Sequence, residues 1–275
     1  MSTSMPKQFF EAFKATFENR IGVDLRRRGS ELAVSHQGES EAEFGARLVG
    51  DLYAAMGGPW WTDPKRNVKS NWSWRPEGRD PSDKSDEVVL ERAVCRARSK
   101  VWTYQMPTSS GLRGKHTDKR RSIDLVRMVS PHGFEFIELK VASNDPVFAA
   151  QEILGYGLAY LHARANGYQD RIDDAKGVLR ASRVELVVLG PTAWYQQYFE
   201  RSRSHAELEW LVRAINSGLG VERRRAPGLD QFNISLRWFS YSYIYLYQFL
   251  CSVHDYLLSN IYCYSCTDCG ADLCG

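Results

Sequence analysis

Three charged residues stand out because each lies in a segment that otherwise has the pattern of a buried strand. Asp124 lies within the apolar run 122–129, and Glu138 and Lys140 alternate along the run 134–141. Residues two apart on a strand point to the same face, so Glu138 and Lys140 share one face. A buried carboxylate is costly unless it is ion-paired, hydrogen-bonded or bound to a metal. A common cation site would account for all three residues.

Two carboxylates on neighbouring strands can hold Mg²⁺ or Mn²⁺, hard ions that take oxygen ligands. Such an ion polarises a phosphodiester oxygen, lowers the pKa of a bound water and neutralises charge in the transition state. The ammonium group of Lys140 could orient the attacking water or stabilise phosphoryl charge, and the nearby carboxylates would keep it protonated. The three residues therefore predict metal-dependent hydrolysis of a phosphodiester.

The flanking sequence predicts the elements that position these residues. The two strand-like runs are joined by the Pro- and Gly-containing segment 130–133, which predicts an antiparallel hairpin. A helix is expected to begin near Ser85, and a cap-and-proline signal predicts a second helix over about 146–164. The apolar run 184–189 predicts a strand buried on both faces, parallel to the second strand of the hairpin.

The remaining chain predicts further elements outside this centre. Apolar residues at helical spacing predict two helices before residue 57, helices around 194–199 and 208–215, and an alternating strand around 232–238. We divide the chain into an N-terminal helical and Trp-rich extension (1–84), a catalytic domain (85–240) and a Tyr- and Cys-rich tail (241–275). The apolar part of the tail, 241–262, is interrupted by His254 and Asp255, which favours a packing helix over a membrane span.

The arrangement Ile123-Asp124, a turn, then Phe136-Ile137-Glu138-Leu139-Lys140 resembles the signature of the PD-(D/E)XK nuclease superfamily, with Ile123 in place of the Pro. The resemblance covers about residues 86–189. It implies the restriction-endonuclease-like fold, an α/β architecture with an αβββαβ core and a mixed central sheet flanked by helices. Segment 100–106 is the candidate for the remaining strand of that core. The implied activity is hydrolysis of DNA, either by an endonuclease or by an exonuclease.

The resemblance also implies roles for residues on the two helices. In many members an acidic residue on the first helix joins the metal site, and Glu91 is the matching position beside the two strand carboxylates. A RecB-like branch carries a Gln followed four residues later by a Tyr. Here Gln151 precedes Tyr156 by five residues and Glu152 precedes it by four. Helical periodicity favours Gln151, which shares a face with apolar residues, so we expect Gln151 to position water or phosphate and Glu152 to face elsewhere.

The charge balance gives little indication of a DNA-binding surface. The formal net charge is +3, from 36 Lys and Arg against 33 Asp and Glu, so any basic surface must be local. Lys115, Lys119, Arg120 and Arg121 form the candidate for contacts with phosphates, with a solvated loop as the alternative. Cutting both strands would favour a homodimer. The first ten residues lack the apolar segment of a secretion signal, so we expect a cytoplasmic protein without a membrane partner.

Two other functions are compatible with the sequence. One is a non-catalytic nucleic-acid-binding module on the same fold, which the intact Asp124, Glu138 and Lys140 disfavour. The other is a structural or interaction protein in which these charges are buried ion pairs. The crowded tail cysteines allow zinc binding or an unstructured tail; they are Cys263, Cys266, Cys269 and Cys274. The chain contains no histidine pair of a zinc helix, no G-x-S-x-G sequence and no P-loop, which disfavours metalloprotease, serine hydrolase and NTPase functions.

Overall fold

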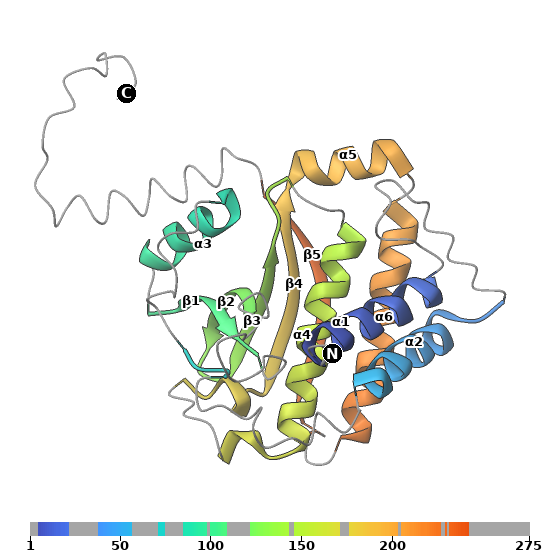
Figure 1. The fold of residues 1–275 in the computed structure, drawn as a ribbon, viewed down its shortest axis with the longest axis horizontal. Helices are drawn as coiled ribbons and strands as arrows, with labels where there is room; N and C mark the ends of the chain where they lie inside the picture. The colour runs from blue at the N-terminus through green and yellow to red at the C-terminus, as the bar shows by residue number, and fades with distance from the viewer. Residues whose placement is uncertain are drawn as a thin grey trace, which may run out of the picture.

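The computed structural model shows an α/β fold in which helices flank one five-stranded mixed sheet (Figure 1). The structure describes residues 5–21, 38–56, 71–74, 85–97, 100–108, 122–142, 146–170, 176–202, 205–226, 229 and 231–241. Strand order in the sheet follows chain order: β1 (Trp102–Pro107), β2 (Ser122–Ser130), β3 (Gly133–Leu139), β4 (Arg183–Pro191) and β5 (Asn233–Tyr241). Neighbours among β1, β2 and β3 are antiparallel, whereas β3, β4 and β5 run parallel.

The strands expected around the charged residues are confirmed. β2 pairs antiparallel with β3, with Leu125 opposite Ile137, so the hairpin is present. Segment 100–106 supplies β1 at the edge of the sheet, and the apolar run 184–189 lies within β4, which is parallel to strands on both sides. All seven residues of β3 are buried. Charged side chains on this strand therefore need specific partners.

The helices cover the two faces of the sheet unequally (Figure 1). On one face α3 (Asp86–Ala97) packs against β1 and β2. On the other, α4 (Pro146–Ala165) packs against β3 and β4, and α6 (His205–Arg225) against β5. Outside α6 lie α2 (Glu41–Met56) and α1 (Met5–Ile21), and α5 (Thr192–Ser202) contacts β4 and β5. Two short 3₁₀ helices, η2 (Tyr168–Asp170) and η3 (Val178–Arg180), follow α4.

The main core fills the space between the sheet and helices α1, α2, α4 and α6. At its centre Tyr160 packs edge-on against Trp72 and Phe136, with ring centroids 5.5 and 5.2 Å away. Because this core also contains Phe13 and Phe44, the two N-terminal helices share the core of the sheet. A smaller cluster beneath α3 includes Leu125, Ile137 and Leu139. The alternation along β3 thus directs Phe134, Phe136 and Glu138 toward α4.

Helix α6 is longer than the segment 208–215 expected from its apolar spacing, because it continues through Gly218 and Gly220. A Cβ on Gly218 would overlap the backbone oxygen of Gly45, and a Cβ on Gly45 would overlap that of Ala214. The missing side chains let α2 and α6 approach closely. This contact offsets the cost of glycine within a helix, which is about 1 kcal/mol.

On the face that carries α3, ion pairs run across the strands. Arg237 lies 2.6 Å from Glu135 and 2.9 Å from Glu185, measured between nitrogen and carboxylate oxygen, while Arg127 also pairs with Glu135 and Arg183 with Glu185. The two carboxylates are largely buried and the three guanidinium groups are exposed at their outer ends. These charged residues therefore bind one another.

Several expectations concern residues outside the described ranges. They are the basic run 115–121, residues 242–262 of the packing helix expected over 241–262, and the four tail cysteines. Tyr241, the first residue of that expected helix, is instead the last residue of β5. Among the described helices, none combines the length and the apolar character that crossing a membrane requires.

Candidate active site

The candidate site lies at the carboxyl end of β3, where this strand leaves the sheet. Continuing the register that pairs Leu125 with Ile137 places Asp124 beside Glu138. The Lys140 ammonium lies 2.5 Å from Glu138 Oε1, so the expectation that these two side chains share a face is confirmed. Glu138 and Lys140 are 4% and 5% exposed. The hairpin therefore brings Asp124, Glu138 and Lys140 together in a largely buried setting.

Asp124 occupies an interruption in the backbone ladder. Between β1 and β2, residue pairs form at Tyr104 and Met106, but Gln105 and Asp124 are skipped. The Asp124 carboxylate instead accepts a hydrogen bond from the backbone N–H of Leu139 at 2.9 Å. This bond fixes the carboxylate at the end of β3.

A third carboxylate comes from α4 and corrects the prediction for Glu152. Its Oε2 lies 3.0 Å from the Lys140 ammonium, so the expectation that Glu152 faces elsewhere is wrong. Fifteen of the 20 residues of α4 are buried, including Gln151 at 2% exposure, so apolar spacing could not distinguish one face of this helix from another. The signal that could have identified Glu152 is its spacing of four residues from Tyr156.

Burial and charge act strongly on the pKa values of these groups. Burial raises the pKa of Glu138 well above its usual value, and the nearby Asp124 raises it further, against the attraction of Lys140. Burial likewise raises the pKa of Asp124 from 3.8 to about 6, against the opposing effects of Lys140 and the Leu139 N–H. Burial alone would lower the pKa of Lys140, but the carboxylates of Glu138, Glu152 and Asp124 raise it overall. The lysine therefore stays protonated at neutral pH.

The site carries more negative than positive charge. When all groups are ionised, three carboxylates and one ammonium give a formal charge of −2. Glu138 Oε2 is buried and has no hydrogen-bond donor among the described residues. It can share a proton with Asp124, since a hydrogen bond between the two carboxyl groups contributes to the pKa of Asp124. A proton or a divalent cation between these carboxylates would relieve the imbalance.

The donor set fits a hard divalent ion. Asp124 and Glu138 supply carboxylate oxygens from adjacent strands, as Mg²⁺ and Mn²⁺ prefer. Among the described residues, no group of three or more Asp, Glu, His or Cys side chains is placed to hold a metal ion unaided. Mg²⁺ commonly uses one or two carboxylates and completes its coordination with water and substrate phosphate. Asp124 and Glu138 fit that pattern.

Glu91 lies on the neighbouring helix α3, buried at 1% exposure. Its Oε2 accepts a hydrogen bond of 2.7 Å from the side-chain amide of Gln105, whose oxygen accepts one from Ser122. Gln105 has a φ of 50°, a left-handed conformation that is strained for a residue with a side chain. One turn earlier on α3, Glu87 accepts a hydrogen bond from the N–H of Val141, just beyond Lys140. The structure therefore connects Glu91 to Gln105, the residue that faces Asp124 across the interrupted ladder.

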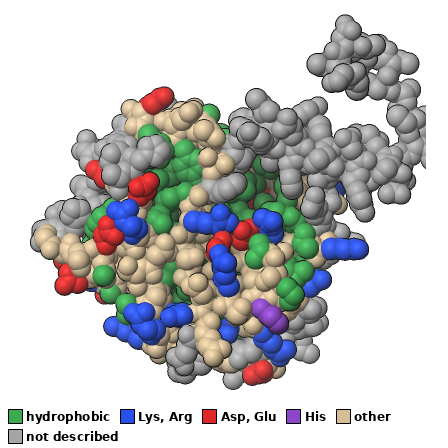
Figure 2. All heavy atoms as spheres, turned by 180° about the vertical axis from the view of Figure 1, so that it is seen from behind, with side chains coloured by type: hydrophobic (Ala, Val, Ile, Leu, Met, Phe, Trp, Pro, Cys, Tyr) green, Lys and Arg blue, Asp and Glu red, His purple; other side chains and the backbone are tan. Residues whose placement is uncertain are grey.

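The described surface does not include the basic run 115–121, which contains the four residues expected to contact phosphates. On the face shown in Figure 2, basic side chains of the described residues lie beside acidic and hydrophobic ones. That face therefore does not present a uniformly basic surface within the described part of the chain.

Comparisons with protein-family models, with curated proteins and with solved structures found no match to this chain.

Proposed function

We propose that this protein is a metal-dependent nuclease of the PD-(D/E)XK type that hydrolyses phosphodiester bonds in DNA. The observation that carries the proposal is the convergence of Asp124, Glu138 and Lys140 at the end of β3. One buried oxygen of Glu138 has no donor within the part of the chain that the structure describes. The element order α3, β1, β2, β3, α4, β4 supports it, since it follows the αβββαβ order of the restriction-endonuclease-like core.

In this proposal Asp124 and Glu138 bind Mg²⁺ or Mn²⁺ through their carboxylate oxygens. The ion, when bound, would supply Lewis-acid stabilisation of the phosphate and a more acidic water. Lys140 stays protonated between Glu138 and Glu152, so it can donate a hydrogen bond to a phosphate oxygen or to the attacking water. Glu152 holds the lysine in place from α4 and acts as a positioning residue.

The proposal also includes roles for residues around this centre. Glu91 supports the metal site, either directly or through Gln105, whose amide it holds. Gln151, buried beside Glu152 on α4, positions water or phosphate. The basic residues Lys115, Lys119, Arg120 and Arg121 bind the DNA backbone, and a homodimer would allow both strands to be cut.

The main competing explanation treats the same charges as a structural ion-pair network. A network that only stabilises the fold would be expected to balance its charges, because an unpaired buried charge costs several kcal/mol. The excess of carboxylates over ammonium groups at this site favours cation binding instead.

Cleavage of single- and double-stranded DNA in Mg²⁺, in Mn²⁺ and in EDTA tests the proposal. Wild type, Glu138→Gln and Lys140→Gln are compared with the control Asp170→Asn, whose carboxylate is 73% exposed and pairs with Arg180 outside the site. We expect cleavage by wild type and the control only with metal, and a loss of at least about 100-fold in both site variants. Folded wild-type protein that cuts neither substrate with either metal would refute the nuclease function.

A further inference from the structure

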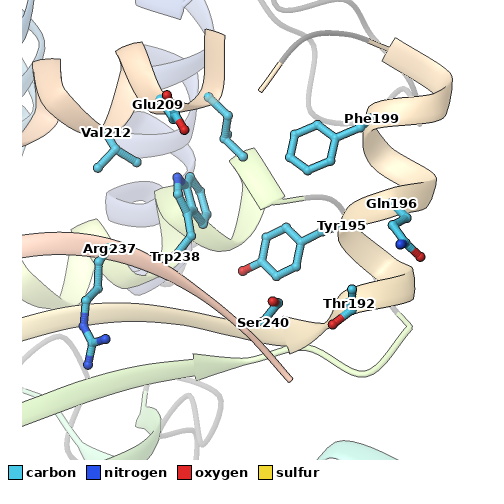
Figure 3. A pocket seen from close by; sticks show the side chains of 10 residues that line it. Thr192, Tyr195, Gln196, Phe199, Glu209, Val212, Arg237, Trp238 and Ser240 are labelled. Atoms are coloured by element: carbon cyan, nitrogen blue, oxygen red, sulfur yellow. The ribbon is translucent and has the colours of Figure 1, made fainter. Parts of the chain in front are cut away.

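A cavity of about 520 Å³ lies between α5, α6 and β5 (Figure 3). Its volume is within the range of about 300–1,000 Å³ that is usual for small-ligand sites. Three aromatic side chains line it, Tyr195 and Phe199 from α5 and Trp238 from β5, and the polar residues Thr192, Glu209 and Ser240 lie at its margins. The lining therefore combines ring surfaces with a few polar groups.

The sheet register connects this cavity to the candidate active site. Glu138 pairs with Val188, and Val188 pairs with Trp238, so these three residues form one row across β3, β4 and β5. Neighbouring strands are about 4.8 Å apart, which puts the backbones of Glu138 and Trp238 about 10 Å from one another. Residues in one row of a parallel sheet project from the same face. Trp238 and the site carboxylate therefore lie on one side of the sheet.

The chemistry of the cavity disfavours an anionic group. Figure 3 shows the guanidinium group of Arg237 pointing away from Trp238, and its partners are Glu135 and Glu185 on the opposite face of the sheet. The charged side chain that remains at the margin is the carboxylate of Glu209, which would repel phosphate. The cavity thus suits an uncharged part of a ligand.

The aromatic residues favour a planar ligand. Tyr195 is fixed by donating its O–H to the Val188 carbonyl at 2.9 Å, and its ring lies 6.4 Å from that of Trp238, edge to face. Aromatic rings of this kind present flat surfaces against which a planar heterocycle can stack.

We propose that this cavity binds a nucleobase of the DNA strand being cut. At about 3.4 Å per stacked base, the 10 Å along the row corresponds to about three nucleotides from the scissile phosphate. The base packs against the rings of Phe199, Tyr195 and Trp238, while its sugar and phosphate stay outside. The identity of the polymer rests on the proposed nuclease function.

Binding of single-stranded oligonucleotides with one abasic position tests this subsite. The abasic position is moved along the strand, and affinity is measured by fluorescence anisotropy in EDTA, so that no strand is cut. Stacking on an aromatic side chain contributes enough that losing the base at one position should weaken wild-type binding about 5- to 150-fold. An abasic site at any other position should change the affinity little.

Variants locate the effect in the cavity. In Trp238→Leu and in Phe199→Leu, the intact oligonucleotide should bind more weakly and the penalty at that one abasic position should disappear. Trp102→Leu, which changes a partly buried tryptophan on β1, is the matched control and should keep the penalty. If the Trp238 variant misfolds, the Phe199 variant on the outer helix α5 still tests the cavity. An equal effect at all positions, or a penalty unchanged in both cavity variants, would overturn the proposal.

The same measurements separate the subsite from the nuclease function. Metal-dependent cleavage, together with an affinity that does not depend on where the abasic position lies, would refute the base-binding cavity and leave the nuclease assignment intact. A position-specific penalty without cleavage under any metal condition would retain the cavity and refute the nuclease. Absence of DNA binding by the folded protein would refute both.

Discussion

Replacing Asp124 with Asn should stabilise the metal-free protein at neutral pH and abolish metal-dependent cleavage. Asn cannot ionise, yet its side-chain oxygen can still accept the hydrogen bond from the N–H of Leu139. The substitution therefore removes charge while keeping the contact that closes the hairpin. If this carboxylate serves to bind a metal ion, removing its charge should raise the stability of the metal-free protein and abolish its activity.

The magnitude follows from the raised pKa of Asp124. Burial raises this pKa from 3.8 to about 6. A carboxyl group with a higher pKa in the folded state contributes its stabilisation below the unfolded pKa and loses it as pH rises through the folded pKa. The loss between pH 4 and pH 7 is up to about 3 kcal/mol, at roughly 1.4 kcal/mol per pH unit. Asp124→Asn should therefore change stability little at pH 4 and stabilise by up to about 3 kcal/mol at pH 7.

Urea unfolding followed by circular dichroism, in EDTA at pH 4 and pH 7, measures this difference directly. The same samples, returned to Mg²⁺, are assayed for DNA cleavage. If Asp124 were instead a structural partner of Lys140, removing its charge would destabilise the protein by about 3–5 kcal/mol at neutral pH. A destabilisation of that size at pH 7 would refute the reasoning.

Three further outcomes are expected. Glu152→Gln should lower the cleavage rate about 10- to 100-fold with little change in metal affinity measured by calorimetry, because Glu152 holds Lys140; an unchanged rate would count against that role. Mg²⁺ should raise the unfolding temperature more at pH 8 than at pH 5, because protons compete for Asp124 and Glu138; a calorimetric scan showing the reverse order would contradict this. Gly157→Ala should destabilise by about 1–3 kcal/mol in urea, since its Cβ would lie 2.5 Å from a methyl carbon of Leu186 on β4; a neutral effect would show that this packing adapts.

The hairpin and its site could be predicted because strand alternation is a local property. Glu138 and Lys140 are two residues apart on a strand, so their common face follows from the sequence alone. The same reasoning failed on α4, where helical periodicity assumes one exposed face. That helix is enclosed by the sheet and by α1, so Glu152 could reach Lys140 without interrupting any apolar stripe.

Long-range packing explains the other differences. Gly218 and Gly220 weaken a helix locally, yet α6 continues through them because α2 approaches at Gly45. The left-handed conformation of Gln105 could not be anticipated either, since glutamine has no preference for it. It depends on Glu91 and Ser122, which come from elements on either side.

The hydrogen bond from the Leu139 N–H to Asp124 makes the end of this hairpin sensitive to solution conditions. In a regular β-ladder a backbone amide bonds to a carbonyl oxygen, whose capacity to accept does not vary with pH. At Leu139 the acceptor is an ionisable group, so protonation or cation binding changes how firmly the last amide of β3 is held. Opening at this point would exchange the Leu139 amide hydrogen with solvent while the rest of the sheet stays closed. A proton or cation bound at the site therefore changes how often the carboxyl end of β3 opens locally.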